Sequence, residues 1–144
     1  MSIKLKITGF DDLMKDIEKA GGDIERITRN CLNTSAKIME SELKQQMRSA
    51  NVKKRLIDSM PRYTIESDYG KITAYVGYKK GEYNPKNPSD AYKVIFLNYG
   101  TPHRTKHGKV TARGFIRKAQ MKAKKRIKKQ QEQCFNDILK GLKK

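Results

Sequence analysis

The sequence predicts an α+β fold, in which N-terminal helices and a long C-terminal helix pack on a small antiparallel sheet. Apolar residues recur at helical spacing over much of 11–47 and again over 112–140. Over 61–78 they alternate with polar residues on both sides of a turn, which is typical of a β-hairpin. The chain has 144 residues, enough for one modest core, so we expect a single domain over 1–144.

The N-terminal segment is predicted to form a short strand followed by a helix. Ile3, Leu5 and Ile7 alternate with lysines, as in a strand that buries one face. Asp11 is placed to cap a helix that starts at Asp12, since an aspartate side chain accepts hydrogen bonds from free amides of the first turn. The inward residues of this helix are expected to be Leu13, Met14 and Ile17.

A second, longer helix is predicted after Gly21-Gly22-Asp23, with Asp23 as its cap. The sequence leaves open whether the glycine pair makes a break or a kink, because each glycine costs a helix only about 1 kcal/mol. The apolar residues of this helix recur at roughly helical spacing: Ile24, Ile27, Cys31, Ile38, Leu43 and Met47.

The hairpin is predicted over about 61–78, where Pro61 introduces the first strand. Asp68-Tyr69-Gly70 supplies the turn, because its glycine tolerates a positive φ. The apolar positions of the two strands are Tyr63, Ile65, Ile72, Ala74 and Val76.

Two loops surround an ambiguous apolar segment. Residues 79–90 lack any periodicity and are expected to form a mobile loop, and a basic loop is expected over 100–111. The segment 91–99 fits either a helix or a buried strand. We favour the helix, because Gly100 is able to end it in the left-handed conformation. In a helix, three aromatic residues share one face: Tyr92, Phe96 and Tyr99.

The last predicted helix covers about 112–140 and has one narrow apolar stripe. Lysines fill its remaining faces, so we expect it to pack on one neighbour and to leave most of its surface in water. The stripe consists of Ile116, Ala119, Ala123, Ile127, Cys134, Ile138 and Leu142.

The two cysteines, Cys31 and Cys134, are predicted to be free. Each lies on the apolar stripe of its own helix, where a free cysteine behaves as a small apolar side chain. The sequence starts without a signal peptide, so a reducing cytoplasm is the expected compartment. No apolar run approaches the ~20 residues that cross a bilayer. A soluble protein without a membrane partner is therefore expected.

Positive charge is concentrated in the last third of the chain. The net charge is +18, and residues 101–144 hold 15 Lys/Arg against two acids. Taken alone, such asymmetry is compatible with a nucleic acid, an acidic protein or a membrane surface as partner, and of these no membrane partner is expected. The candidate contacts for phosphate or an acidic partner are Lys118, Lys122, Lys125, Arg126 and Lys129. A surface that only keeps the protein soluble is the alternative.

No catalytic residue, cofactor or metal is predicted. His103 and His107 are four residues apart, a spacing that suits a metal on a helix. They lie in the basic loop, between Pro102 and Gly108, so we interpret them as an exposed pair. A small nuclease or toxin that uses them is the weakest functional alternative. The sequence has no glycine-rich phosphate loop of the GxxxxGK type.

One motif stands out in the last third. The apolar segment ends in Tyr99-Gly100-Thr101, and after the basic loop Arg113 leads into Phe115-Ile116-Arg117, with Ala119 two residues further on. This order resembles the small head–tail joining and tail-completion proteins, or minor tail components, of long-tailed double-stranded-DNA bacteriophages. Their pattern has an acid, an aromatic, Gly and Thr, followed by a Pro-Phe-Leu-Arg-Pro-Ala-like run. This chain has Asn98 in place of the acid, and Gly114 and Lys118 in place of the prolines.

The resemblance implies a structural protein of the virion rather than an enzyme. It implies a homo-oligomer, in which several copies form a ring at the neck or tail, between connector or portal-side proteins and tail-tube proteins. The subunits would be made in the host cytoplasm, and DNA would pass through the ring. The motif residues are then assembly positions: Tyr99, Gly100, Thr101, Arg113, Phe115 and Arg117. A non-specific nucleic-acid-binding protein that uses the basic C-terminal helix is the alternative function.

Overall fold

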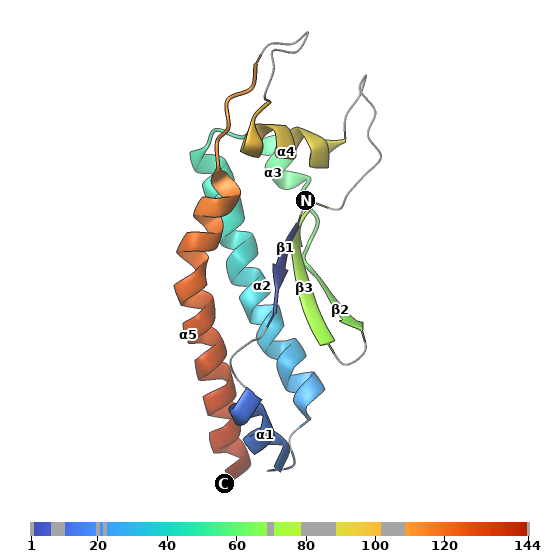
Figure 1. Cartoon of the computed structure of the whole chain (residues 1–144), viewed down its shortest axis with the longest axis vertical. Helices are drawn as coiled ribbons and strands as arrows, with labels where there is room; N and C mark the ends of the chain where they lie inside the picture. Colours follow the sequence, from blue (N-terminus) through green and yellow to red (C-terminus); the bar gives the residue numbers. More distant parts are fainter. Residues whose placement is uncertain are drawn as a thin grey trace.

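The computed structural model describes residues 2–6, 11–19, 21, 23–68, 71–78, 89–101 and 109–143. In these ranges the chain forms five helices and a three-stranded antiparallel sheet, so the predicted α+β fold is confirmed. Two long helices, α2 (Ile24–Ser49) and α5 (Phe115–Lys143), lie side by side along the long axis of the molecule (Figure 1). The sheet packs on α2, which therefore lies between α5 and the sheet.

The sheet contains the predicted hairpin and the predicted N-terminal strand. Its strands are β1 (Ser2–Leu5), β2 (Thr64–Asp68) and β3 (Lys71–Gly77), in the order β1-β3-β2. Ile3 lies opposite Val76 across the β1–β3 pair, and both side chains are buried. β1 is therefore an edge strand, which pairs with β3 on the side away from β2.

The glycine pair makes a break between two helices. The first helix, α1 (Asp11–Lys19), begins one residue before the predicted start. Gly21 has a φ of +83°, and α2 starts only after Asp23. As predicted, Asp23 caps α2, because its Oδ1 accepts a hydrogen bond from the Arg26 amide at 3.1 Å.

The ambiguous segment is the helix α4 (Asp90–Tyr99), so the strand alternative is wrong. Gly100 ends it with a φ of +74°, and the Gly100 amide donates to the Phe96 carbonyl at 2.8 Å. A short helix, α3 (Lys54–Asp58), was not predicted. Ser89 and Asp90 start α4 instead of ending the loop expected at 79–90, and the remainder of that loop lies outside the described residues.

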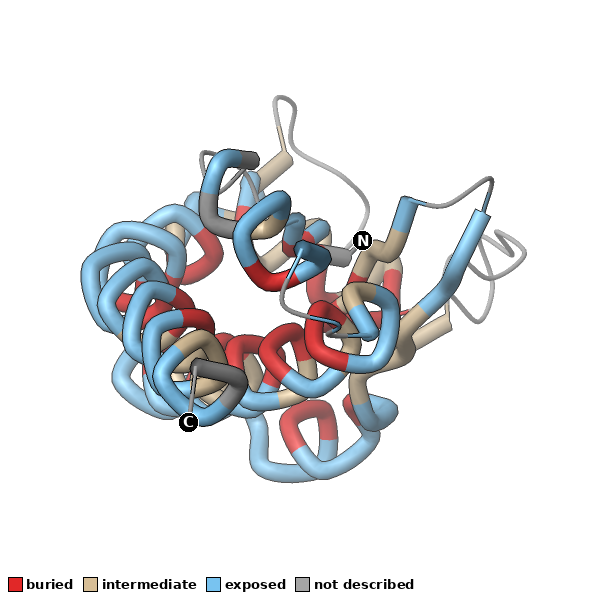
Figure 2. Tube along the Cα trace, turned by 90° about the horizontal axis from the view of Figure 1, so that it is seen from below, coloured by how far each residue is buried: buried red, intermediate tan, exposed pale blue. Residues whose placement is uncertain are grey.

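The core lies mainly between α2, α5 and the sheet. The first half of the predicted α5 stripe, from Ile116 to Ile127, is buried there. Seen along the long axis of the molecule, buried positions face inward and exposed positions face outward (Figure 2). Ala119 and Ala123 of this stripe are fully buried. The end of α5 also packs on α1, around the fully buried Ile17 and Phe135, so the prediction that α5 packs on one neighbour is wrong.

The prediction of free cysteines is wrong, since Cys31 and Cys134 form a disulfide bond. α2 and α5 run antiparallel, so an early position of α2 meets a late position of α5 (Figure 1). The Cα atoms of the two cysteines are 6.2 Å apart, within the range that a disulfide spans. Their predicted place on apolar stripes is confirmed: Cys31 is fully buried and Cys134 is half-buried.

In the part of the chain that the structure describes, no helix is both long and apolar enough to cross a membrane.

Candidate assembly and anion-binding surfaces

The motif formed by residues 99–101 and 113–119 makes a joint between α4 and the start of α5. The amides of Arg113 and Gly114 donate to the carbonyls of Leu97 and Asn98, each at 3.0 Å. Residues 97–98 belong to the last turn of α4, whose carbonyls have no partner within the helix. The segment that precedes α5 therefore satisfies the end of α4 and fixes where α5 begins.

A second pair of hydrogen bonds closes the joint. The Thr101 amide donates to the Val110 carbonyl at 2.9 Å, and the Val110 amide donates to the Thr101 Oγ1 at 2.9 Å. Thr101 thus uses both its backbone and its hydroxyl to hold the two ends of the basic loop together. Most of that loop, including His103 and His107, lies outside the described residues.

The side chain of Asn98, which belongs to α4, caps the N-terminus of α5. Its side chain is 4% exposed, and its Oδ1 accepts the Ile116 amide at 3.0 Å. That amide is in the first turn of α5, where amides lack partners within the helix. A carboxylate would supply the same acceptor, so the amide of Asn98 and the acid of the family pattern are equivalent in this contact.

The two glycines of the joint, Gly100 and Gly114, differ in the space available for a side chain. A Cβ on Gly100 would lie 2.8 Å from both the Ala112 nitrogen and the Val110 oxygen, and the φ of Gly100 is positive. Gly114 has a φ of +60° but open space around it. A proline has φ near about −65°, so the proline of the family pattern would require a different backbone path at position 114.

The remaining motif residues divide into inward and outward positions. Phe115 is fully buried at the start of α5. The Arg113 guanidinium donates to the carbonyls of Ala50 and Asn51, at 3.0 and 3.2 Å, where α2 ends. A cation is favourable there, because a helix C-terminus carries partial negative charge. Arg117 and Tyr99 point outward, and Tyr99 is 66% exposed.

The outer face of α4 is aromatic. Ala91, Val94 and Asn98 make its buried stripe. At 3.6 residues per turn, the three aromatic residues predicted to share a face lie on the opposite side of the helix. Tyr92 and Phe96 are half-buried, and Tyr99 is exposed.

A groove of about 440 Å³ adjoins this aromatic face. Phe96 and Leu97 of α4 and Leu56 of α3 contribute apolar surface to it. Its cations are Lys53, Arg55, Lys93 and Arg113. One carboxylate, that of Asp90, lies 3.6 Å from Arg55 and 3.8 Å from Lys93, so two cations share a single partner. The α4 end of the molecule therefore combines exposed aromatic surface with positive charge.

Four of the five predicted phosphate contacts form one row on α5. Lys118, Lys122, Lys125 and Lys129 follow a 4-3-4 spacing, which keeps them on one side of a helix. All four are exposed, on the side opposite the buried stripe. The fifth, Arg126, differs: its Nη1 lies 3.5 Å from the Glu42 carboxylate of α2. Arg126 therefore bridges α5 to α2.

A second cationic row runs beside the first and was not among the candidate contacts. Arg117, Lys124 and Lys128 have the same spacing around Met121, and all four residues are exposed. The 4-3-4 repeat was the signal that could have found this row. Together the two rows cover most of the outer surface of α5 between residues 117 and 129.

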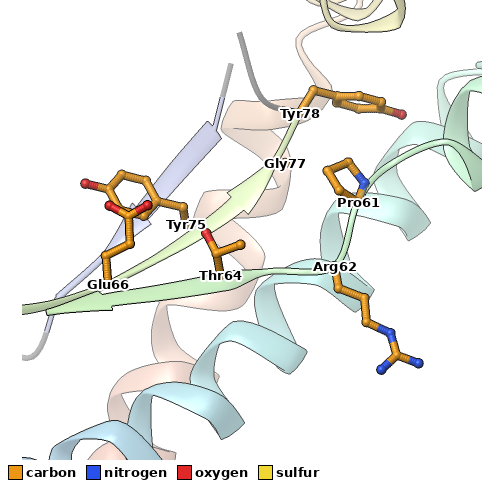
Figure 3. Close-up of a pocket in the computed structure, with 7 residues that line it drawn as sticks. All are labelled: Pro61, Arg62, Thr64, Glu66, Tyr75, Gly77 and Tyr78. Atoms are coloured by element: carbon orange, nitrogen blue, oxygen red, sulfur yellow. The ribbon is translucent and has the colours of Figure 1, made fainter.

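A shallow pocket of about 350 Å³ lies on the hairpin (Figure 3). Thr64, Glu66 and Tyr75 project from the same side of the strands, whereas Arg62 points away. At its upper end the buried Tyr78 hydroxyl donates to the Leu56 carbonyl. Burial raises the pKa of Tyr78 to about 12, so this hydroxyl is poorly suited to exchange a proton near neutral pH.

The described residues offer no metal-binding group of three or more His, Cys, Asp or Glu side chains. Among the described residues that line the hairpin pocket, Glu66 is the one carboxylate, and none is a histidine or a cysteine.

Comparison with known proteins gave no match to this chain among protein-family models, curated proteins or solved structures.

Proposed function

We propose that the chain is a structural subunit of the neck or tail of a long-tailed double-stranded-DNA bacteriophage or prophage. It joins head to tail, or completes the tail, by assembling into a ring of identical copies, and it catalyses no reaction. Its partners are connector or portal-side proteins on one side and tail-tube proteins on the other. Its location is the virion, with assembly in the host cytoplasm.

The outward aromatic face of α4 is the observation that carries this proposal. Aromatic side chains are enriched at protein interfaces, where they bury a large area at little conformational cost. The motif residue Tyr99 is 66% exposed on this face. Phe96 of the same face also lines the groove. A neighbouring subunit that covers this face would remove exposed apolar surface from water.

The joint between α4 and α5 also supports the proposal. Gly100, Thr101, Arg113 and Phe115 hold α4 in a fixed position against the long α2–α5 pair. A rigid platform under an interface lowers the entropy lost on association. Of the six motif residues, four thus build the platform, and Tyr99 is presented on it.

The test is the state of assembly of the purified protein, alone and mixed with connector and tail-tube proteins. Light scattering and electron microscopy should detect closed rings of this chain or a complex with one of these partners. A protein that stays monomeric in every mixture would contradict the proposal.

A pair of matched variants locates the interface. Tyr99→Ser removes an exposed aromatic from α4, and Met121→Ser removes an equally exposed apolar side chain, also 66%, from α5. If Tyr99 is central to the interface, its loss should weaken assembly about 30-fold, the equivalent of about 2 kcal/mol. Met121→Ser should assemble as the wild type does. Equal assembly of both variants would place the interface elsewhere.

A further inference from the structure

We propose that the outer surface of α5 binds the phosphate backbone of duplex DNA without reading its sequence. We call this surface the lysine face. Its seven cations are Arg117, Lys118, Lys122, Lys124, Lys125, Lys128 and Lys129. The inference does not depend on ring assembly, because the lysine face is complete within one chain.

The cations of the lysine face are exposed and unpaired. No acid occurs in the sequence between Phe115 and Gln131. Within the described part of the chain, the only ion pair made by α5 is that of Arg126 with Glu42, and Arg126 is not part of the lysine face. Like charges three and four residues apart destabilise a helix. A bound polyanion would relieve this repulsion.

The other long helix is an internal comparison. α2 has a similar length, but it alternates the two signs of charge: Arg29 pairs with Glu25 at 3.4 Å, and Lys44 pairs with Glu40 at 3.1 Å. Mixed charge is sufficient to keep a helical surface in water. Since α2 meets that requirement with mixed charge, solubility alone does not account for seven cations of one sign on α5.

The shape of the lysine face fits a linear polyanion. Residues 117–129 extend over roughly 18 Å at 1.5 Å per residue. Duplex DNA carries about one charge per 1.7 Å of its axis, so a duplex offers phosphates along the whole length of the lysine face. An acidic protein surface has no such repeat.

The lysine face has charge but no means to read bases. Its one apolar member is Met121, and the two aromatic residues of α5, Phe115 and Phe135, are fully buried. Stacking on exposed bases requires aromatic side chains, and such stacking is the usual basis of single-strand binding. Lysine acts as a point charge towards phosphate. The expected contact is therefore electrostatic and independent of sequence.

Fluorescence anisotropy with a labelled 20-base-pair duplex tests the proposal. With four to seven phosphate contacts, the logarithm of the binding constant should fall against the logarithm of salt concentration with a slope of about −4 to −6. One variant changes four lysines of the face to glutamine: Lys118, Lys122, Lys125 and Lys129. The control removes the same charge from exposed lysines elsewhere: Lys15, Lys19, Lys37 and Lys71.

We expect the face variant to bind at least ten-fold more weakly at moderate salt and to lose about 3 to 4 units of slope. The control should bind within about three-fold of the wild type, and circular dichroism should find both variants folded. Equal weakening in the two variants would overturn the proposal, because net charge would then be the cause.

Two further measurements complete the test. Polyglutamate of matched length should bind much more weakly than the duplex, and two duplexes of unrelated sequence should bind equally. Binding of polyglutamate as tight as that of DNA would assign the face to an acidic protein instead. A preference of more than ten-fold for one duplex would overturn backbone recognition. Electron microscopy of the face variant separates the two roles, since rings that no longer bind DNA would leave the proposed assembly function intact.

Discussion

Of the two glycines in the joint, Gly100 is the one at which substitution should cost more. Gly100→Ala places a Cβ against the backbone of residues 110 and 112 at a positive φ, and we expect a loss of about 2–4 kcal/mol in the free energy of unfolding. Gly114→Ala has the same sign of φ but open space, so it should lose only about 1–2 kcal/mol. Gly141→Ala lies within α5 without a close neighbour and should gain up to about 1 kcal/mol. Urea denaturation measures all three.

The three substitutions add the same methyl group, so their order is the result of interest. Equal losses at Gly100 and Gly114 would mean that the close approach of residues 110 and 112 contributes nothing.

Tyr78 should make stability depend on alkaline pH. In the unfolded chain its hydroxyl ionises near pH 10.0, whereas in the folded protein burial raises the pKa of Tyr78 to about 12. Below pH 10 both states are protonated. Between about pH 10 and 12 the unfolded state loses the proton first, so the free energy of unfolding falls, by about 2–3 kcal/mol in total.

Tyr78→Phe is the control for this pH effect, because it retains every lysine that titrates in the same range. The difference in unfolding free energy between wild type and variant, measured by denaturant titration, should decrease from pH 9 to pH 12. A difference that is constant with pH would contradict the role given to Tyr78.

At the scale of elements, Phe115 anchors the start of α5. Phe115→Ala should cost about 3–5 kcal/mol, since the side chain is fully buried and its removal leaves a cavity. Met121→Ala removes a large side chain from the exposed face of the same helix and should change stability by less than about 0.5 kcal/mol. Thermal melting distinguishes them, and an unchanged melting temperature for Phe115→Ala would rule out the anchor.

The elements that sequence predicts well are those with a local signal. The hairpin, α2 and α5 each show a period over many residues, and Asp23 marks the start of α2 as a cap. α3 was missed because five residues are too few to show a helical period. The partner of β1 was not predictable either, because its pairing with β3 joins residues more than 60 positions apart.

The candidate site was predictable in its residues but not in their roles. The sequence placed Tyr92, Phe96 and Tyr99 on one face, yet it did not indicate that this face points outward. Asn98 was noted only as a departure from the family pattern, and its contact with the Ile116 amide emerges only when α4 meets α5. Arg126 belonged to the same lysine-rich segment as its neighbours, and only the position of Glu42 on α2 separates it from them.

On the scale of the whole molecule, the disulfide joins positions 103 residues apart and fastens α2 to α5 near α1. Closing so long a loop restricts the unfolded chain, so loss of the bond should lower the free energy of unfolding by about 2–4 kcal/mol. The Cys31→Ala/Cys134→Ala variant measures this loss by denaturant titration. Dithiothreitol should destabilise the wild type and leave the double variant unchanged. An equal response of the two proteins would mean that the bond contributes nothing.

The same disulfide bond persists when the protein is denatured without a reducing agent, so it can be detected in the denatured chain. Because Cys31 and Cys134 enclose most of the sequence, the oxidised chain in detergent remains more compact than the reduced one. It should therefore migrate faster in a non-reducing denaturing gel. The chain extracted with thiols blocked from the cells that produce it would reveal by its mobility whether the two helices are already covalently joined there.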